Sequence, residues 1–158
     1  MLAGVGPELH RSGELLPAAR AGFREGVTCL EPVEPLELRT LYAHSDALVL
    51  PSIATRTFRE PWGLVVNEAM NRALPVIASD DVGAAAGGLV RDAVNGLIVP
   101  AGEPAALAQA LRRVAGDREL RARLGSAGAE RVRAFNHDAW AEGFSAALRS
   151  IGVARERC

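Results

Sequence analysis

The sequence predicts an α/β domain with a doubly wound parallel sheet, Rossmann-like, followed by C-terminal helices. Short and continuously apolar segments, such as residues 48–50 and 96–100, alternate with segments whose apolar residues have helical spacing. Continuous apolar runs are typical of parallel strands, because helical crossovers cover both faces of such a sheet. From residue 102 onward only helical patterns remain.

Apolar runs mark the strands in the first part of the chain, and glycine or proline marks their ends. Strands are expected over residues 2–6, 27–30 and 46–50, with helices over residues 18–25 and 36–42. Few apolar residues precede the first Gly-Pro turn, whereas a core strand is normally longer. We therefore expect a domain over residues 1–158 that is truncated at its N-terminus.

The second part continues the alternation with a helix over residues 63–74 and strands over 75–78 and 96–100. Three further helices are expected to begin at Pro104, after the cap Asp117 and after the cap Asn136. Their apolar positions are Leu107, Leu111 and Val114, then Leu120, Leu124 and Ala127, then Trp140, Phe144 and Leu148. We interpret all three helices as core scaffold.

Composition excludes several classes of protein. With 158 residues, of which 49% are hydrophobic, the chain can form one globular domain. Its 18 basic residues, all arginine, balance 19 acidic ones, so it lacks the positive charge that nucleic-acid binding needs. No apolar run is long enough to span a membrane. Cys29 and Cys158 fit neither a metal site nor a disulfide framework, and no signal peptide is present, which favours the cytoplasm.

The segment most informative about function is residues 51–68. It begins at the carboxyl end of the strand over residues 46–50, where open α/β sheets bind their ligands. The loop before the next helix has about a dozen residues, although 2–6 are usual for such a connection. Loops of excess length are usually functional, so position and length both indicate a ligand site.

The helix after this loop is suited to a phosphate group. If it starts near Gly63, the amides of Gly63, Leu64 and Val65 are free to bind an anion. Glu68 is expected at the rim of the crevice, partly shielded, where its carboxylate can accept two hydrogen bonds from a ribose diol. Glu60 can approach the same ligand from the other side. A nucleotide-sugar has the matching shape. An apolar stripe of this helix is expected at Val65, Val66, Ala69, Met70 and Ala73.

Residues 60–70, read together with residues 74–79, resemble the Glu-x7-Glu region of the retaining family 4 glycosyltransferases of GT-B fold. Further similarities are the Gly-x-Gly-Pro turn in residues 2–9, the strand and Pro-Ser segment in residues 41–52, and the Asn-Gly strand in residues 95–100. An isolated Glu-x7-Glu pattern is common by chance. The ordered set extends along almost the whole chain and is highly specific.

The resemblance implies the donor-binding half of such an enzyme, and a bacterial source is expected.

 By family analogy, Glu60 is the catalytic residue and binds the donor sugar, and Glu68 binds the ribose. The backbone near Trp62, Gly63, Leu64 and Val65 would hold sugar and diphosphate, and the backbone around Val33 would meet the nucleobase. The implied substrate is a nucleotide-diphospho-sugar, with no metal or other cofactor.

Departures from the family pattern limit what the resemblance implies. Trp62 replaces a usual Phe, Ala73 replaces a usual Gly, and residues 83–88 lack the acidic residue that many relatives have there. In the family, the basic pair that binds the diphosphate would precede residue 1, and the acceptor-binding N-terminal domain is expected to be absent from this chain. The isolated chain is therefore expected to be inactive, and any association with a membrane would depend on the missing domain.

Arg56 and Arg59 are candidates for contacts to the diphosphate, although loop arginines are usually solvated. Asp80 and Asp81 are expected in a turn rather than in a metal site. The histidines have neither a carboxylate nor a nucleophile in a triad-like context, and we interpret them as surface or structural residues; they are His10, His44 and His137.

Two alternatives to a transferase domain stay open at this point. One is a catalytically incomplete module that binds nucleotide-sugars, alone or together with a separate partner chain, because catalysis requires donor and acceptor to be held together. The other is a flavodoxin-like or receiver-like regulatory domain that shares only the doubly wound class. Its phospho-acceptor would have to be Asp80, and the chain has no lysine to complete such a site.

Overall fold

A computed structural model of the chain describes residues 2–4, 27–30 and 33–152. The chain divides into two compact units, Met1–Leu41 and Tyr42–Cys158. In the first unit, strands β1 (Leu2–Gly4) and β2 (Val27–Cys29) pair in parallel. Helix α2 (Pro35–Ala43) begins in this unit and ends just inside the second. The helix expected over residues 18–25 lies outside the described residues.

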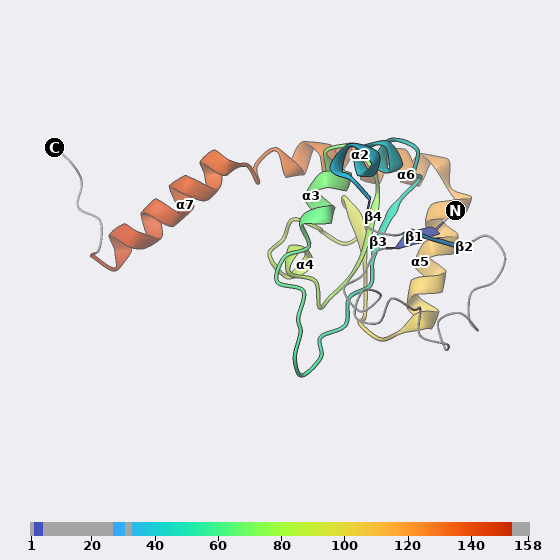
Figure 1. Cartoon of the computed structure of the whole chain (residues 1–158), viewed down its shortest axis with the longest axis horizontal. Helices are drawn as coiled ribbons and strands as arrows, with labels where there is room; N and C mark the ends of the chain where they lie inside the picture. Colours follow the sequence, from blue (N-terminus) through green and yellow to red (C-terminus); the bar gives the residue numbers. More distant parts are fainter. Residues whose placement is uncertain (1, 5–26, 31–32, 153–158) are drawn as a thin grey trace. The chain divides into compact units, whose positions relative to one another are not determined.

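The second unit contains a parallel three-stranded sheet in the order β3-β4-β5. Its strands are β3 (Leu48–Leu50), β4 (Val76–Ser79) and β5 (Gly96–Val99). Its helices are α3 (Leu64–Met70), α4 (Gly83–Ala86), α5 (Pro104–Gly116), α6 (Arg118–Val132) and α7 (His137–Ser150). Figure 1 shows α3 and α4 on one side of this sheet and α5 on the other. The α/β class and the parallel pairing are thereby confirmed.

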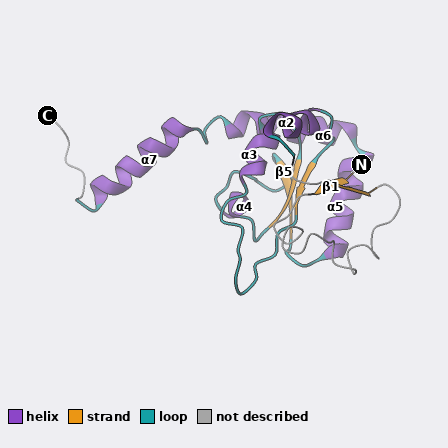
Figure 2. Ribbon diagram, viewed as in Figure 1, coloured by secondary structure: helices purple, strands orange, loops and turns teal. Residues whose placement is uncertain are grey.

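The central strand β4 is buried along its whole length, as its continuous apolar sequence predicts. On one face, Ile77 packs with Leu97 and with Val114 of α5. On the opposite face lie Val76 and Ala78, which are fully buried as well. Burial on both faces requires helices on both sides of the sheet, and this is the arrangement in Figure 2.

Two of the predicted helix caps are confirmed. The carboxylate of Asp117 accepts a hydrogen bond from the amide of Leu120 at 2.9 Å, at the start of α6. The side-chain oxygen of Asn136 accepts one from the amide of Ala139 at 2.8 Å, at the start of α7. Each cap satisfies an amide that has no partner within the helix, which fixes where the helix begins.

Two expectations about packing are wrong. Helix α7 contains no buried residue, and Trp140 and Phe144 stack on each other at 5.2 Å while both stay exposed. Amphipathic spacing predicts a face suited to burial, but it does not supply the partner. The stripe of α3 is also shorter than expected, because the helix ends at Met70 and Ala73 is exposed.

Ala73 follows α3 and has a left-handed backbone with φ of 54°. Its carbonyl oxygen would lie only 1.9 Å from a Cβ atom built at Gly125, in the middle of α6. A side chain at position 125 would therefore push apart α6 and the turn that precedes β4. Glycine at this position permits the close packing of the helix.

We expect Gly125→Ala to lower the free energy of unfolding by about 3 kcal/mol, because the new methyl group meets backbone that cannot rotate away. Urea unfolding followed by circular dichroism measures this loss. The matched control is Gly116→Ala in α5, where a Cβ atom would meet nothing within 4 Å. Equal stability of the two variants would contradict the close packing at Gly125.

Ala73→Gly should raise the free energy of unfolding by about 0.5–1 kcal/mol. Glycine adopts the left-handed conformation without the steric penalty of a Cβ atom, and this gain exceeds its larger loss of entropy on folding. Ala115→Gly is the control: this exposed residue of α5 should lose about as much stability as Ala73→Gly gains. Destabilisation of both variants in thermal unfolding would overturn this expectation.

Candidate functional site

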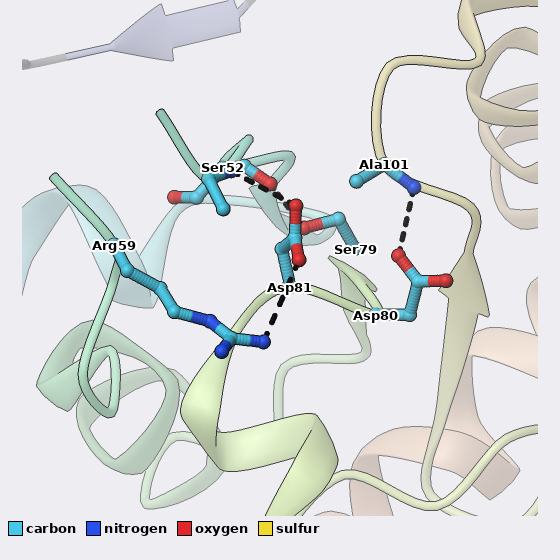
Figure 3. Close-up of polar contacts among 7 residues, drawn as sticks. Ser52, Arg59, Ser79, Asp80, Asp81 and Ala101 are labelled. Carbon is cyan, nitrogen blue, oxygen red and sulfur yellow. Dashed lines mark hydrogen bonds and ion pairs between the residues drawn. The ribbon is translucent and has the colours of Figure 1, made fainter. Parts of the chain in front are cut away.

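The candidate site lies at the carboxyl edge of the sheet in the second unit. Because β3, β4 and β5 are parallel, the loops that follow them start at the same edge. Polar contacts connect these loops (Figure 3). The Ser79 hydroxyl donates a hydrogen bond to the carbonyl of Ser52, and the Asp80 carboxylate accepts one from the amide of Ala101 at 2.8 Å. The loops therefore form one connected surface.

Asp81 holds the long loop after β3 through two contacts. Its Oδ2 atom accepts a hydrogen bond from the amide of Ala54 at 2.9 Å, and its Oδ1 atom lies 3.7 Å from Nη2 of Arg59. The loop tip closes on itself, since the amide of Thr55 donates to the carbonyl of Phe58 at 2.8 Å. The loop thus has an ordered path in spite of its exposure. Asp80 and Asp81 both stabilise loops, in agreement with the turn role expected for them.

The two candidate phosphate-binding arginines differ in their surroundings. Arg59 is paired with Asp81, although its side chain is 70% exposed. Arg56 is exposed and has no ion pair among the residues that the structure describes. Their contact with a diphosphate stays a prediction.

Glu60 is half-buried at the end of the loop, and the short helix α4 fixes its backbone. The carbonyl of Glu60 accepts a hydrogen bond from the amide of Gly83 at 3.3 Å, and the carbonyl of Trp62 accepts one from the amide of Ala84 at 2.8 Å. A Cβ atom at Gly83 would lie 1.9 Å from the carbonyl oxygen of Pro61. The first turn of α4 therefore packs directly against the backbone next to Glu60.

The side chain of Trp62 anchors this segment from the other side. Its indole N–H donates a hydrogen bond to Oδ1 of Asn67 at 2.8 Å, and its ring lies 5.7 Å from the ring of Phe135. A Cβ atom at Gly87 would lie 2.6 Å from the indole, so the end of α4 also contacts Trp62. Trp62 thus connects the start of α3 with α4 and with the residues that follow α6.

Gly63 is the cap residue directly before α3, and its backbone has a conformation that only glycine adopts readily. Its φ is 85°, and a Cβ atom there would lie 2.7 Å from Cδ2 of Leu50. The amides of Gly63, Leu64 and Val65 have no hydrogen-bond acceptor among the described residues. The sequence predicted the helix start to within one residue, and it predicted that these amides would be free.

Glu68 lies one turn further along α3, where its Oε2 atom accepts a hydrogen bond of 2.8 Å from the hydroxyl of Tyr42. Glu68 is exposed rather than partly shielded as expected, since α3 directs this position to the surface. Tyr42 is only 8% exposed. Burial, followed by the hydrogen bond to Glu68 and the charge of Glu68, raises the pKa of Tyr42 above its ordinary value.

Sequence reasoning missed two components of the site. Tyr42 falls at the end of the helix predicted over residues 36–42, and its hydroxyl is the signal that could have identified it, since a buried tyrosine usually finds a polar partner. Helix α4 was missed because its residues Gly83–Ala86 have no helical periodicity. Val33 lies between β2 and α2 in the first unit, so its role stays a prediction.

The described part of the chain contains neither a candidate metal site nor a membrane-spanning helix. Among residues 2–4, 27–30 and 33–152, no three His, Cys, Asp or Glu side chains are grouped so that they could hold a metal ion. In the same part of the chain, no helix is long and apolar enough to cross a membrane.

Comparison with known proteins identifies the family. Residues 2–131 match the model of the family described as glycosyl transferases group 1. The chain belongs to this family. This chain is 36% identical over 158 residues to a D-inositol 3-phosphate glycosyltransferase of Nocardia farcinica, covering 95% of the chain and 33% of the relative. It is 38% identical over 138 residues to the D-inositol 3-phosphate glycosyltransferase of Streptomyces griseus, covering 83% of the chain and 27% of the relative.

Solved structures agree with this membership. This chain matches sucrose-phosphate synthase from Thermosynechococcus elongatus with a TM-score of 0.66 and 35% identity, over 82% of the chain and 31% of the synthase. It also matches HepE of Anabaena, solved in complex with UDP and glucose. The TM-score is 0.65 and the identity 27%, over 83% of the chain and 34% of HepE. The chain spans about a third of the length of these proteins.

The contacts of Asp81 can be tested through the order of the loop. Asp81→Ala removes both the acceptor for Ala54 and the partner of Arg59, so trypsin should cleave after Arg56 and Arg59 several times faster. The loss in free energy of unfolding should be only about 1 kcal/mol, because the ion pair is exposed. Mass spectrometry of timed digests identifies the cleavage sites. Glu142→Ala, in exposed α7, is the control, and equal cleavage rates in both variants would contradict the role of Asp81.

Proposed function

We propose that this chain is the donor-binding part of a glycosyltransferase that transfers a sugar from a nucleotide-diphospho-sugar to an acceptor with retention of configuration. The observation that carries the proposal is that Glu60 and Glu68 flank, along the chain, the amides at the start of α3 that have no acceptor among the described residues. The UDP complex of the structural neighbour HepE supports the same class of ligand.

Each part of the site has a distinct chemical role in this proposal. The exposed carboxylate of Glu68 accepts hydrogen bonds from the ribose hydroxyls, and Glu60 hydrogen-bonds the donor sugar. The amides of Gly63, Leu64 and Val65, together with the backbone near Trp62, bind the sugar and the diphosphate. They stabilise the negative charge that develops on the leaving nucleoside diphosphate, while an oxocarbenium-like centre forms beside Glu60.

The partner of this domain is an acceptor-binding domain, within a longer chain or on a separate one. Donor and acceptor must be held together for transfer, which one donor-binding domain does not accomplish by itself. We infer that the reaction takes place in the cytoplasm without a metal ion. A module that binds nucleotide-sugars without turnover is the second candidate, because catalysis needs an acceptor held beside the donor.

Two glutamate variants of the 158-residue chain test the assignment of the site. Glu68→Gln should weaken UDP binding by about 1.5–3 kcal/mol, because it loses charge-assisted hydrogen bonds to the ribose. Glu60→Gln should weaken the binding of UDP-glucose and leave that of UDP unchanged. Isothermal titration calorimetry with both ligands measures these effects, with Glu142→Gln as a charge-matched control on α7.

Equal losses for both ligands in both variants would refute the two separate roles. A panel of UDP, GDP and ADP tests the choice of base, and failure of all three to bind at millimolar concentration would refute the proposed donor site in this chain. A donor-hydrolysis assay in parallel separates the two candidates, since a module without turnover releases no free sugar.

A further inference from the structure

The hydroxyl of Tyr42 donates its hydrogen bond to a residue that the proposed function uses. Tyr42 lies in the last turn of α2 and is buried, whereas Glu68 lies on α3 and is exposed. The two side chains are 26 residues apart in sequence and meet at 2.8 Å between Oη and Oε2. A buried donor and an exposed acceptor thus form a contact at the surface of the unit.

This contact restrains the part of Glu68 that a ligand would need. An exposed glutamate on a helix samples several rotamers, and a ligand that requires one of them must order the side chain on binding. The hydrogen bond from Tyr42 to Oε2 favours one position of the carboxylate before any ligand arrives. It leaves Oε1 and the remaining lone pair of Oε2 to accept two further hydrogen bonds.

The protonation state of Tyr42 suits a permanent donor. Burial and the neighbouring carboxylate raise the pKa of its hydroxyl, so the proton stays on the oxygen throughout the range in which proteins are active. Tyr42 therefore donates this hydrogen bond, and Glu68 accepts it.

We propose that Tyr42 is a positioning residue of the donor site, which orders the Glu68 carboxylate for the two hydroxyls of the nucleotide ribose. The inference rests on the proposed function of Glu68 and extends it to a residue that does not itself touch the ligand. Tyr42→Phe is the natural variant for a test, because it removes the hydroxyl and keeps the buried ring.

The decisive measurement compares UDP with 2′,3′-dideoxyuridine diphosphate, which lacks both ribose hydroxyls. Tyr42→Phe should weaken UDP binding by about three- to tenfold, less than Glu68→Gln, because it acts only through the order of the carboxylate. It should leave binding of the dideoxy nucleotide unchanged. In the double variant Tyr42→Phe/Glu68→Gln, the tyrosine change should add no further loss.

Equal weakening of both nucleotides by Tyr42→Phe would overturn the proposal, since a general structural defect does not depend on the ribose hydroxyls. No weakening by Tyr42→Phe, combined with a loss in Glu68→Gln, would overturn the role of Tyr42 and leave the proposed function intact. Failure of UDP, GDP and ADP alike to bind the unaltered chain would instead refute the proposed function. Thermal unfolding of each variant shows whether it is folded.

The contact itself can be checked without any ligand. Tyr42 is the only tyrosine of the chain, so the absorbance of tyrosinate during an alkaline titration reports on this residue alone. Glu68→Gln should lower the pKa of Tyr42 toward its ordinary value, because the charge that opposes ionisation is removed. Glu142→Gln should leave it unchanged. An unchanged pKa in Glu68→Gln would show that the two side chains are not in contact in solution.

Discussion

The close approach of α4 to the backbone of residues 60–62 determines where the candidate site lies. Gly83 has no side chain, and any Cβ atom there would occupy the position of the Pro61 carbonyl. The amides of Gly83 and Ala84 can therefore reach the carbonyls of Glu60 and Trp62. These contacts occupy the amides at the start of α4, whereas the amides at the start of α3 have no acceptor among the described residues.

The loops around this contact are held by hydrogen bonds to backbone rather than by an apolar core. Asp80 and Asp81 accept hydrogen bonds from the amides of Ala101 and Ala54, and each bond joins two different loops. The ion pair of Arg59 adds little stability because its side chain is largely exposed. Such a surface can be ordered and still present its charged groups to solvent, as a binding site requires.

Beneath the loops, strand β4 and the turn before it are packed more tightly than the site. Val76, Ile77 and Ala78 are fully buried, and the Ala73 carbonyl leaves room only for glycine at position 125. Rigid packing here fixes the direction in which α3 and β4 leave the core. The candidate site residues are then carried on elements that are held by this packing.

The sequence by itself determined the strands and most helix starts, because apolar runs, caps and glycines are local signals. It also predicted Glu60 and Glu68 as site residues, and their roles stay predictions. Only the tertiary structure decided the contact of Tyr42 with Glu68, since 26 residues separate them and no local pattern relates the two. The same holds for α4, whose four residues are stabilised by contacts outside the helix. Local propensity predicts elements, whereas the pairing of distant side chains depends on how those elements pack.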